Sequence, residues 1–471
     1  MVFYYIINIM LCRVLPFMKN QEEERVMASC IDNLTGLYNK SGFYKAAAQL
    51  LGQNPEEGFC LLYWNIRQLK VINDMFGHSA GSRILIEFGE TLQKEFGGDL
   101  SACGRIEQDR FLCLVPARRL ADGAWESVSV IRYIAGGAEY HFFACCGAYR
   151  IENRELPLEM MADKALVAME CARDSYLKPC VWFDESMWDA IVEEQQLNMD
   201  FATAIREKQF EVYYQPICRA ADGMVTGAEA LIRWNHPQRG LLVPARFVPQ
   251  FERNGLISAL DRYVWEEVCA TVGKRLAAGE QTVPVALNVS KAEFYDASSF
   301  EDLYATVCRH GVPPDYLRIE ITESSYAADP APVQRAITKL HAFGFKVLMD
   351  DFGSGESSLG MLKDYPVDVL KVDRTFLSDI GANPKARVIL ESVVGMAKRL
   401  DLLVVAEGVE TRAQWDYMRE IGCDLVQGYY FYKPMPAPQF IALMERATPA
   451  ADPLLDRDSP RVLPAEMRNI S

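Results

Sequence analysis

The stretch KVLMDDFGSGESSL, residues 346–359, joins an apolar run to two adjacent carboxylates. Residues 346–349 have the pattern of a buried strand, and Asp350 and Asp351 stand at its end. Carboxylates at the end of a buried strand are costly unless hydrogen bonds or a cation compensate them. Hard cations such as Mg²⁺ and Mn²⁺ prefer carboxylate oxygens, but two acids before a glycine are also common in surface turns. The stretch alone therefore leaves a metal site and a surface turn as alternatives.

Seven further segments of strand-like composition accompany this one in the second half of the chain. Helix-like segments such as 334–343 and 386–400 separate most of them. Near-continuous apolar strands that alternate with helices indicate a parallel sheet buried on both faces. About eight such strands within roughly 250 residues predict a TIM-like (β/α) barrel. The predicted strands are residues 211–217, 227–233, 283–289, 317–322, 347–350, 369–372, 403–406 and 425–431.

Polar side chains recur at one end of these predicted strands. In a barrel the C-terminal ends of the strands meet on one face, so residues far apart in sequence converge there. One or two such residues are explained as hydrogen-bonded core polar groups, but polar groups from seven strands indicate a functional pocket. The residues are Glu229, Asn288, Glu320, Glu323, Asp350, Asp351, Lys371, Asp373, Glu407, Glu410 and Gln427.

Composition limits the classes of function. The chain has 471 residues, a formal net charge of −15 and 50% hydrophobic residues. The acidic balance argues against a nucleic-acid polymer as partner, because such binding needs basic surface. The 13 cysteines show no pairing rhythm and no CxxC spacing, which indicates reduced thiols and a cytoplasmic protein. Cys145 and Cys146 lie in an apolar run and are predicted to pack in a core.

The N-terminal residues 1–17, MVFYYIINIMLCRVLPF, are strongly apolar but are interrupted by Arg13 and Pro16. A spanning helix needs about 20 apolar residues, so we expect a segment that does not span a bilayer. Membrane contact through this segment is the less favoured alternative. No basic region precedes the apolar run, which argues against a signal peptide.

The next part of the chain predicts a smaller mixed α/β domain. It carries DNLTGLYN at residues 32–39 and NDMFGH at residues 73–78. On these motifs and their spacing it resembles the GGDEF domain of diguanylate cyclases, which implies a nucleotidyl-cyclase-like fold. Its strand-like runs are residues 58–66, 101–106, 111–115 and 141–151, and its helix-like runs are 82–97 and 161–175.

Several residues that this resemblance assigns to cyclase chemistry are altered. The signature is EQDRF at residues 107–111, Asn65 stands for the metal-binding aspartate, and Arg67 stands where a second aspartate is usual. Ser82 stands for a guanine-contacting aspartate, and the inhibitory RxxD motif is missing at residues 98–101. A nucleotide triphosphate with Mg²⁺ needs anionic ligands, so we expect a degenerate domain with a structural or regulatory role. Residual nucleotide sensing is the alternative.

The second domain carries EALIRW at residues 229–234 and resembles EAL-domain phosphodiesterases, which hydrolyse cyclic di-GMP to linear pGpG. The resemblance implies two Mg²⁺ or Mn²⁺ ions per site, which activate water and stabilise charge at phosphorus. It rests as well on YQP, NVS, EITE, DDFG, KVD, EGVET and QGYYF, which begin at Tyr214, Asn288, Glu320, Asp350, Lys371, Glu407 and Gln427.

The resemblance also implies a role for each matching residue. Glu356 departs from the family, which usually has tyrosine there, so the sequence leaves the catalytic rate open. Metal ligands are expected at Glu229, Asn288, Glu320 and Asp350 for the first ion, and at Asp350 and Asp351 for the second. Glu407 and Lys371 are expected to activate or orient water; Gln215, Arg233, Asp373, Glu410 and Gln427 to bind substrate; and Glu323 to anchor the loop after the two aspartates.

Two other functions stay open at this point. A non-catalytic cyclic di-GMP receptor or scaffold is disfavoured by the complete carboxylate set, and a metallophosphodiesterase for another nucleotide is disfavoured by Gln215 and Arg233. The resemblance also implies a homodimer. The expected boundaries are 1–27 for the apolar segment and connector, 28–185 for the degenerate GGDEF domain, 186–196 for a helical linker, 197–447 for the EAL domain and 448–471 for a flexible tail.

Overall fold

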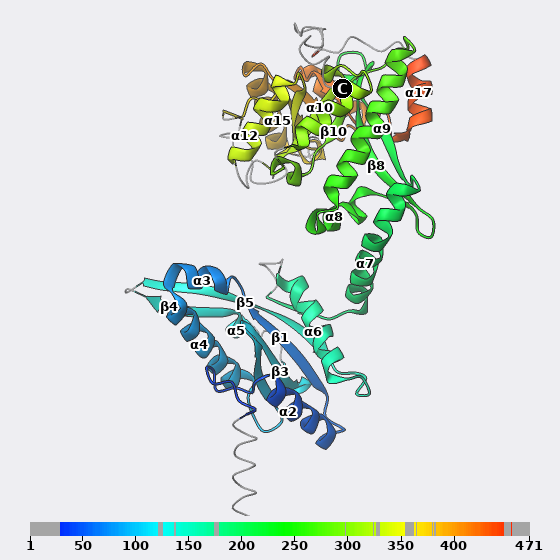
Figure 1. Cartoon of the computed structure of the whole chain (residues 1–471). Coiled ribbons are helices and arrows are strands. Elements are labelled where there is room, and N and C mark those ends of the chain that lie inside the picture. Colours follow the sequence, from blue (N-terminus) through cyan, green and yellow to red (C-terminus); the bar gives the residue numbers. More distant parts are fainter. Residues whose placement is uncertain are drawn as a thin grey trace, which may run out of the picture. The chain divides into compact units, whose positions relative to one another are not determined.

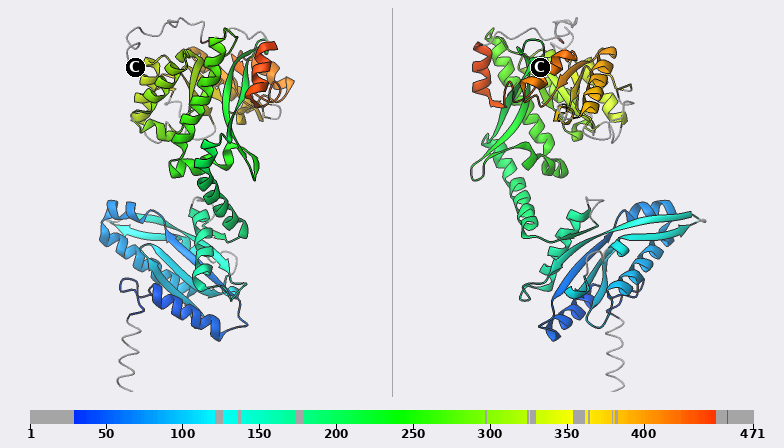
Figure 2. Two further views of the ribbon diagram at one scale, coloured as in Figure 1. Left: turned by 45° about the vertical axis from the view of Figure 1, so that its right-hand side comes forward. Right: turned by 180° about the vertical axis from the view of Figure 1, so that it is seen from behind.

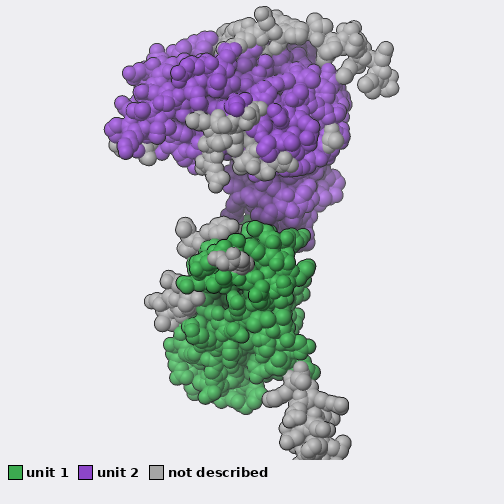
Figure 3. Space-filling model, turned by 90° about the vertical axis from the view of Figure 1, so that its left-hand side faces the viewer, with its two compact units in different colours: residues 1–193 green, residues 194–471 purple. Residues whose placement is uncertain are grey.

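The computed structural model divides the chain into two compact units, residues 1–193 and 194–471 (Figure 3). It describes residues 29–120, 126–135, 138–173, 179–296, 298–323, 325, 330–353, 362–363, 365–378, 380, 383–446 and 454. The predictions for residues 1–27 and for Glu356 lie outside these residues. Within them, no helix is both long enough and apolar enough to cross a membrane.

The N-terminal unit is built on a sheet in the order β2-β3-β1-β5-β4, with β6 beside β5. Only β5 and β6 run parallel among these described pairs. The elements are α2 (Lys40–Gln53), β1 (Phe59–Ile66), α3 (Leu69–Phe76), α4 (His78–Phe96), β2 (Ala102–Glu107), β3 (Arg110–Pro116), η1 (Ala117–Arg119), α5 (Glu126–Ser129), β4 (Val130–Ala135), β5 (Ala138–Arg150), α6 (Leu158–Arg173) and β6 (Cys180–Trp182).

Helices cover both faces of this sheet (Figures 1 and 2). Successive side chains of a strand point to opposite faces, so β1 contributes to two cores. Trp64 packs with residues of α4, whereas Leu61 packs with residues of α2 and α6. Cys145 and Cys146 point to different cores and are both buried, which confirms the prediction that they pack inside the domain.

The C-terminal unit contains an eight-stranded closed barrel, as predicted. Going round it, the strands are β7, β8, β10, β11, β12, β13, β14 and β15, and β15 pairs again with β7. Helix α7 (Glu185–Arg206) spans the predicted linker and continues into this unit. The strands are β7 (Phe210–Arg219), β8 (Val225–His236), β9 (Gly240–Leu242), β10 (Val285–Asn288), β11 (Leu317–Thr322), β12 (Lys346–Phe352), β13 (Val369–Val372), β14 (Leu403–Ala406), β15 (Leu425–Val426) and β16 (Met435–Pro436).

Helices surround the barrel in the ribbon views (Figures 1 and 2). They include 3-10 turns, denoted η. The helical elements are η2 (Pro244–Arg246), α8 (Val248–Asn254), α9 (Ile257–Ala277), η3 (Lys291–Phe294), α10 (Ser299–Arg309), η4 (Pro314–Tyr316), α12 (Pro330–Ala342), α14 (Thr375–Ser378), α15 (Pro384–Arg399), α16 (Arg412–Glu420) and α17 (Ala437–Arg446).

The expectation of a parallel sheet is wrong for the first strand. β7 runs antiparallel to both of its neighbours, whereas every pairing from β8 round to β15 is parallel. A short turn with Gly223 at φ 75° joins β7 to β8. Two strands joined by so short a turn form an antiparallel hairpin, because parallel neighbours need a long crossover connection.

The last strand is also shorter than predicted, since β15 ends at Val426 and not at residue 431. At Gly428 the chain passes so close to the backbone of Val409 that a Cβ atom would lie 2.2 Å from the Val409 carbonyl oxygen. The amide of Val409 donates to the carbonyl of Gln427, and the amide of Tyr430 donates to the carbonyl of Val409. These bonds turn the chain out of the barrel directly after Gln427.

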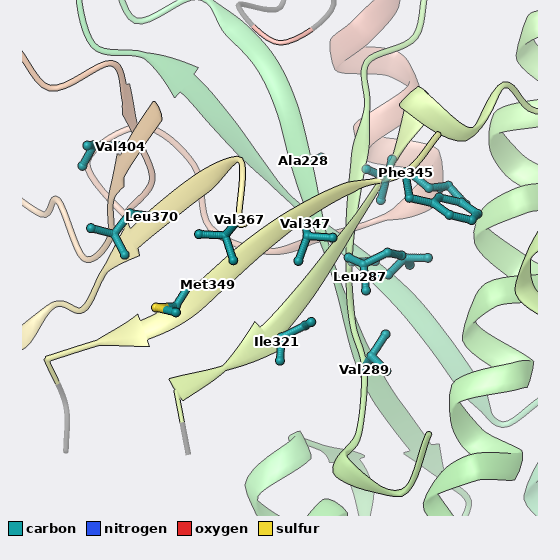
Figure 4. Close-up of a cluster of buried hydrophobic side chains, with 14 of the residues drawn as sticks. Ala228, Leu287, Val289, Ile321, Phe345, Val347, Met349, Val367, Leu370 and Val404 are labelled. Atoms are coloured by element: carbon teal, nitrogen blue, oxygen red, sulfur yellow. The ribbon is translucent and has the colours of Figure 1, made fainter. Parts of the chain in front are cut away.

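The barrel strands separate an outer core from the lumen. Figure 4 shows part of the outer core, which the helices cover. Leu454, within the predicted flexible tail, is buried in the lumen cluster, so the chain is fixed at that point; the other tail residues from 448 lie outside the described part. The lumen cluster comprises Ile217, Ala286, Leu348, Val369, Leu403, Val405, Leu425 and Leu454.

Candidate active site and metal centre

Charged residues occupy the lumen above this apolar cluster. Side chains on one face of a strand recur every second residue, so Lys371 follows Val369 into the lumen and Glu407 follows Val405. The same spacing places Gln427 above Leu425. The strand periodicity thus puts an apolar layer at one level of the lumen and a polar layer at the next, toward the C-terminal ends of the strands.

Lys371 is the centre of the polar layer. Its ammonium Nζ lies 2.6 Å from Glu407 Oε1, 2.9 Å from Glu320 Oε1 and 2.9 Å from Asp350 Oδ1. Glu229 Oε2 is 3.4 Å away. Lys371 is 1% exposed, so solvent does not screen these contacts. Four carboxylates, three on strands and one directly after β14, therefore surround one cation, and three negative charges are in excess if all four are ionised.

Donors are scarce for the oxygens of this cluster among the residues that the structure describes. Among these residues Glu320 Oε2 has no hydrogen-bond partner, and Glu320 Oε1 and Asp350 Oδ1 contact only the ammonium of Lys371. A buried oxygen without a hydrogen bond is costly, and a buried excess of negative charge adds to the cost. Hard divalent cations coordinate such oxygens and neutralise such charge, so the donor set fits the metal centre implied by the sequence.

Amide side chains hold Glu229 within the cluster. Asn288 Nδ2 donates to Glu229 Oε1 at 3.0 Å, and Gln427 Nε2 donates to Glu229 Oε2 at 2.8 Å. Gln427 also contacts Gln215 Oε1 at 3.1 Å, and Gln215 Nε2 donates to the carbonyl of Tyr432 at 3.2 Å. The carbonyl of Tyr432 is a contact that the sequence patterns did not indicate. The network fixes Glu229 from both sides.

Asp350 and Asp351 face the same site because β12 is irregular there. Neighbouring residues of a regular strand point to opposite faces. The register of β12 against β13 shifts between Met349 and Phe352, and Asp351 has φ 58° in the left-handed region. As a result, oxygens of Asp350, Asp351 and Glu407 all lie within 4.8 Å of one another. From the sequence we expected Glu407 to act on the attacking water and not to bind metal. Its position beside the two aspartates was therefore not predicted.

Burial and mutual repulsion shift the pKa values of the cluster. Burial, followed by the charge of Glu229, raises the pKa of Glu320 well above its usual value, against the effect of Lys371. Burial also raises the pKa of Glu407 to about 8, and burial with the charge of Asp350 raises the pKa of Asp351. Perturbed acids of this kind gather at functional sites.

Lys371 and Glu229 shift in the directions that favour their charged forms. Burial would lower the pKa of Lys371, but the surrounding carboxylates outweigh it and raise that pKa well above its usual value. Burial would raise the pKa of Glu229, but Lys371 and the two amide donors hold it below its usual value. Lys371 therefore stays a cation and Glu229 an anion, whereas the raised pKa values of Glu320, Asp351 and Glu407 favour their protonated forms.

Glu323 contacts the beginning of the loop that follows the two aspartates. Its Oε2 accepts a hydrogen bond from the amide of Gly353 at 3.0 Å. Gly353 has φ 93°, and a Cβ atom at this position would lie 2.0 Å from the ring of Phe376. The glycine is required by both its conformation and this close contact. This hydrogen bond is the contact expected of a residue that anchors the loop.

The remaining residues expected at the site lie around its edge. Arg233 is half-buried, with its guanidinium carbon 5.5 Å from the ring centre of Tyr213. Asp373 accepts a hydrogen bond from the amide of Thr375, and its charge contributes to the raised pKa of Asp351. The side chain of Glu410 is exposed, and the structure shows no contact between it and the described residues of the cluster.

The altered positions of the N-terminal unit form no comparable acidic group among its described residues. Asn65, at the end of β1, pairs with Arg110 on β3. The guanidinium of Arg67 turns inward, where Nη2 donates to the carbonyl of Ala172 at 2.7 Å. Burial raises the pKa of the Cys145 thiol, and Arg67 opposes that shift, which places the guanidinium beside this thiol.

Family models match most of the chain. The model described as EAL domain matches residues 198–434, and that of the diguanylate cyclase GGDEF domain matches residues 29–141. The bifunctional diguanylate cyclase/cyclic di-GMP phosphodiesterase MucR of Pseudomonas aeruginosa is 31% identical over 426 residues, covering 89% of this chain and 62% of MucR. The cyclic di-GMP phosphodiesterase NbdA of the same organism is 31% identical over 418 residues, covering 86% of this chain and 52% of NbdA. The chain therefore spans less than two thirds of either relative.

Solved structures agree with these matches. A MucR phosphodiesterase in complex with cyclic di-GMP is 36% identical, has a TM-score of 0.50, and covers 52% of this chain and 99% of that chain. The EAL enzyme Bd1971 with cAMP and cyclic di-GMP has a TM-score of 0.52, covers 72% of this chain and 82% of that chain, and at 24% identity supports the fold alone. The chain belongs to the EAL domain family, and a GGDEF domain precedes its EAL domain.

Proposed function

We propose that the C-terminal unit is a metal-dependent phosphodiesterase that hydrolyses cyclic di-GMP to pGpG. The observation that carries the proposal is the ring of four carboxylates around the single ammonium of Lys371, in which Glu320 Oε2 has no hydrogen-bond partner among the described residues. The likeness to the MucR phosphodiesterase, whose structure holds cyclic di-GMP, supports the choice of substrate. A cytoplasmic location accords with a cyclic dinucleotide substrate.

The residues present divide between two metal positions. Glu229, Asn288, Glu320 and Asp350 would hold the first Mg²⁺ or Mn²⁺, and Asp350 and Asp351 would hold the second, with Glu407 close enough to join them. When bound, such a metal pair polarises the phosphoryl oxygens and lowers the pKa of a bound water.

The protein's own groups supply the proton transfer. Glu407 is the candidate base, because it adjoins both Asp350 and Asp351 and has a carboxylate that accepts a proton near neutral pH. Lys371 stays protonated and holds Glu407 through its 2.6 Å contact. Its positive charge also compensates negative charge that develops at phosphorus.

The edge of the site supplies the binding groups. Arg233 is suited to a phosphate, because its guanidinium presents several donors in a fixed plane. Gln215 and Gln427 offer amide groups beside Glu229, while Asp373 and Glu410 offer carboxylates to guanine N–H groups. Glu323 would hold the loop that carries Asp351.

Product analysis tests this proposal. The full-length protein is incubated with cyclic di-GMP and Mg²⁺ or Mn²⁺, and the products are separated by chromatography. We expect pGpG, with no turnover in the presence of a chelator. Tight binding of cyclic di-GMP without any product would contradict catalysis and support the alternative of a receptor or scaffold.

The N-terminal GGDEF unit is proposed to make no cyclic di-GMP and to serve a structural or regulatory role. The support is the neutral Asn65 and the inward-turned Arg67, which leave the expected metal site without these carboxylates. A full-length Glu229→Ala variant, in which breakdown of product is prevented, is incubated with GTP and Mg²⁺. We expect no cyclic di-GMP; a signal that disappears on adding Asp109→Ala would refute the proposal.

Homodimerisation is proposed from the resemblance, and exposed apolar residues of α15 support it. Val388 and Ile389 are 62% and 51% exposed. Light scattering at the assay concentration measures the mass in solution. A monomeric mass at this concentration would contradict the proposal.

A further inference from the structure

A buried carboxylate outside the polar ring contacts the chain just after a proposed metal ligand. Asp261 lies near the beginning of α9 and is 8% exposed. Its Oδ2 accepts a hydrogen bond from the amide of Ser290 at 3.0 Å. Ser290 follows Asn288 by two residues, and the amide group of Asn288 donates to Glu229 at 3.0 Å. Helix α9 is thereby connected to the edge of the active site.

This bond holds a segment that has few other attachments. Strand β10 has only four residues and ends at Asn288. Beyond it, the amide of Val289 donates to the carbonyl of Glu320 at 3.2 Å, and the amide of Ser290 donates to Asp261. The backbone at residue 288 sets the direction of the Asn288 side chain. That backbone is held in turn by the hydrogen bonds of the residues that follow it. Asp261 is thus one of two backbone anchors directly after Asn288 in the described residues.

Burying the carboxylate of Asp261 in these surroundings costs free energy of folding. Burial raises the pKa of Asp261 to about 7, and the charges of Glu293 on η3 and Glu252 on α8 add to the rise, against the hydrogen bonds from Ser290. Glu293 is fully buried, and its Oε1 accepts no hydrogen bond from the described residues. A carboxylate placed among other acids and away from solvent destabilises a fold unless a specific contact offsets the cost. The Ser290 amide is that contact.

We propose that Asp261 is a positioning residue for the first metal position: by holding the Ser290 amide, it fixes the backbone that directs Asn288 toward Glu229. This inference rests on the proposed function, in which Asn288 is a metal ligand. Residues behind metal ligands orient those ligands and commonly change metal affinity by about 10- to 100-fold when removed.

The hydrogen bond can be removed from either side with a matched control on each. Asp261→Ala removes the acceptor, whereas Asp261→Asn keeps a side-chain oxygen. Ser290→Pro removes the N–H donor, and the native φ of −70° suits proline. Ser290→Ala keeps the N–H and removes only the hydroxyl. Agreement between Asp261→Ala and Ser290→Pro would assign the effect to the bond they share.

The readout is Mn²⁺ binding to the full-length, substrate-free protein, followed by electron paramagnetic resonance. We expect Asp261→Ala and Ser290→Pro to weaken Mn²⁺ binding by at least about 10-fold, and Asp261→Asn and Ser290→Ala to stay within about threefold of the parent. Asp424→Ala controls for a general loss of stability. It removes a similar bond, 3.0 Å from Asp424 Oδ2 to the amide of Val404, at the other end of the barrel strands.

The outcomes separate this inference from the proposed function. If Asn288→Ala weakens Mn²⁺ binding but Asp261→Ala and Ser290→Pro do not, Asp261 is not a positioning residue. If Asn288→Ala leaves binding unchanged, the metal assignment itself fails, and the inference fails with it. Should Asp261→Ala not fold, the pair Ser290→Pro and Ser290→Ala decides the matter alone, because that pair leaves the carboxylate in place.

Discussion

The two units differ in the charge of the residues at the ends of their buried strands. In the C-terminal unit, four buried acids share the single ammonium of Lys371, and Glu320 Oε2 has no hydrogen-bond partner among the described residues. In the N-terminal unit, Asn65 is neutral, and Arg67 bonds to the carbonyl of Ala172. The C-terminal unit thus gathers buried acids that suit the proposed metal, whereas the described residues of the N-terminal unit form no comparable acidic group. The comparison indicates that the two units are distinguished by buried charge gathered at one place, which is typical of functional sites.

The largest expected effect is the loss of a proposed metal ligand in the C-terminal unit. Asp350→Ala and Glu229→Ala are each expected to lower phosphodiesterase turnover by about 1,000-fold or more, because each removes a carboxylate from the metal centre. Product chromatography with saturating Mn²⁺ measures the rate. Asp109→Ala in the N-terminal unit is the matched control and should leave this rate unchanged. If either barrel variant kept a turnover close to that of the parent, the C-terminal unit would not depend on these carboxylates and would not differ from the N-terminal unit in this respect.

Metal affinity is expected to depend strongly on pH, because protons and metal compete for the same oxygens. The pKa of Glu407 is raised to about 8, and those of Glu320 and Asp351 are raised as well. Below about pH 8 Glu407 holds a proton that a metal must displace, and the raised pKa values of Glu320 and Asp351 act in the same direction. Affinity should therefore increase by about 10- to 100-fold from pH 6 to pH 8. Calorimetric titration with Mn²⁺ measures this change. An affinity that is constant over the range would show that the acids are not ligands.

A smaller effect is expected for the residue that holds the loop. Glu323→Ala removes the acceptor for the Gly353 amide and should lower turnover by about 10-fold. Binding of cyclic di-GMP should stay close to that of the parent, because the proposed substrate-binding residues Gln215, Arg233 and Gln427 are untouched. The turnover number and the dissociation constant are measured separately. Glu323→Gln retains an acceptor oxygen and should recover most of the turnover; equal losses in both variants would refute the anchoring role.

The smallest expected effect is a difference in pH-dependent stability between the units without metal. Raised pKa values in the C-terminal unit, about 7 for Asp261 and about 8 for Glu407, mean that its stability falls as pH rises through those values. In the N-terminal unit, burial would raise the pKa of Asp32, but hydrogen bonds from Thr35 outweigh burial and lower that pKa. The stability that Asp32 contributes is therefore lost only as pH falls below about 4.

Scanning calorimetry of the full chain with a chelator tests this difference. One transition should fall by about 5 °C between pH 6 and pH 8.5 and recover on addition of Mg²⁺, while the other should stay unchanged. Asp261→Asn should reduce the fall, because it removes one of the buried titrating groups. If both transitions respond equally to pH and to Mg²⁺, the acidic centre does not distinguish the units.

Much of the barrel was accessible from residue patterns alone. Near-continuous apolar runs located β11, β13 and β14 at their observed bounds, since a strand buried on both faces has apolar residues along its length. Polar residues at the strand ends indicated where the site would lie. The roles of individual residues remain predictions, because the sequence names donors but does not fix their distances.

The sequence by itself determined the residue types, their order and the family, because strand periodicity and acidic motifs are local properties of the chain. Only the tertiary structure decided which groups meet. The irregular register of β12 turns Asp351 to the side of Asp350, and the closed barrel brings four carboxylates to one ammonium. The pairing of β7 with β15 and the Ser290 contact of Asp261 likewise depend on residues far apart in sequence. Such contacts arise from packing, which sets distances that no local pattern contains.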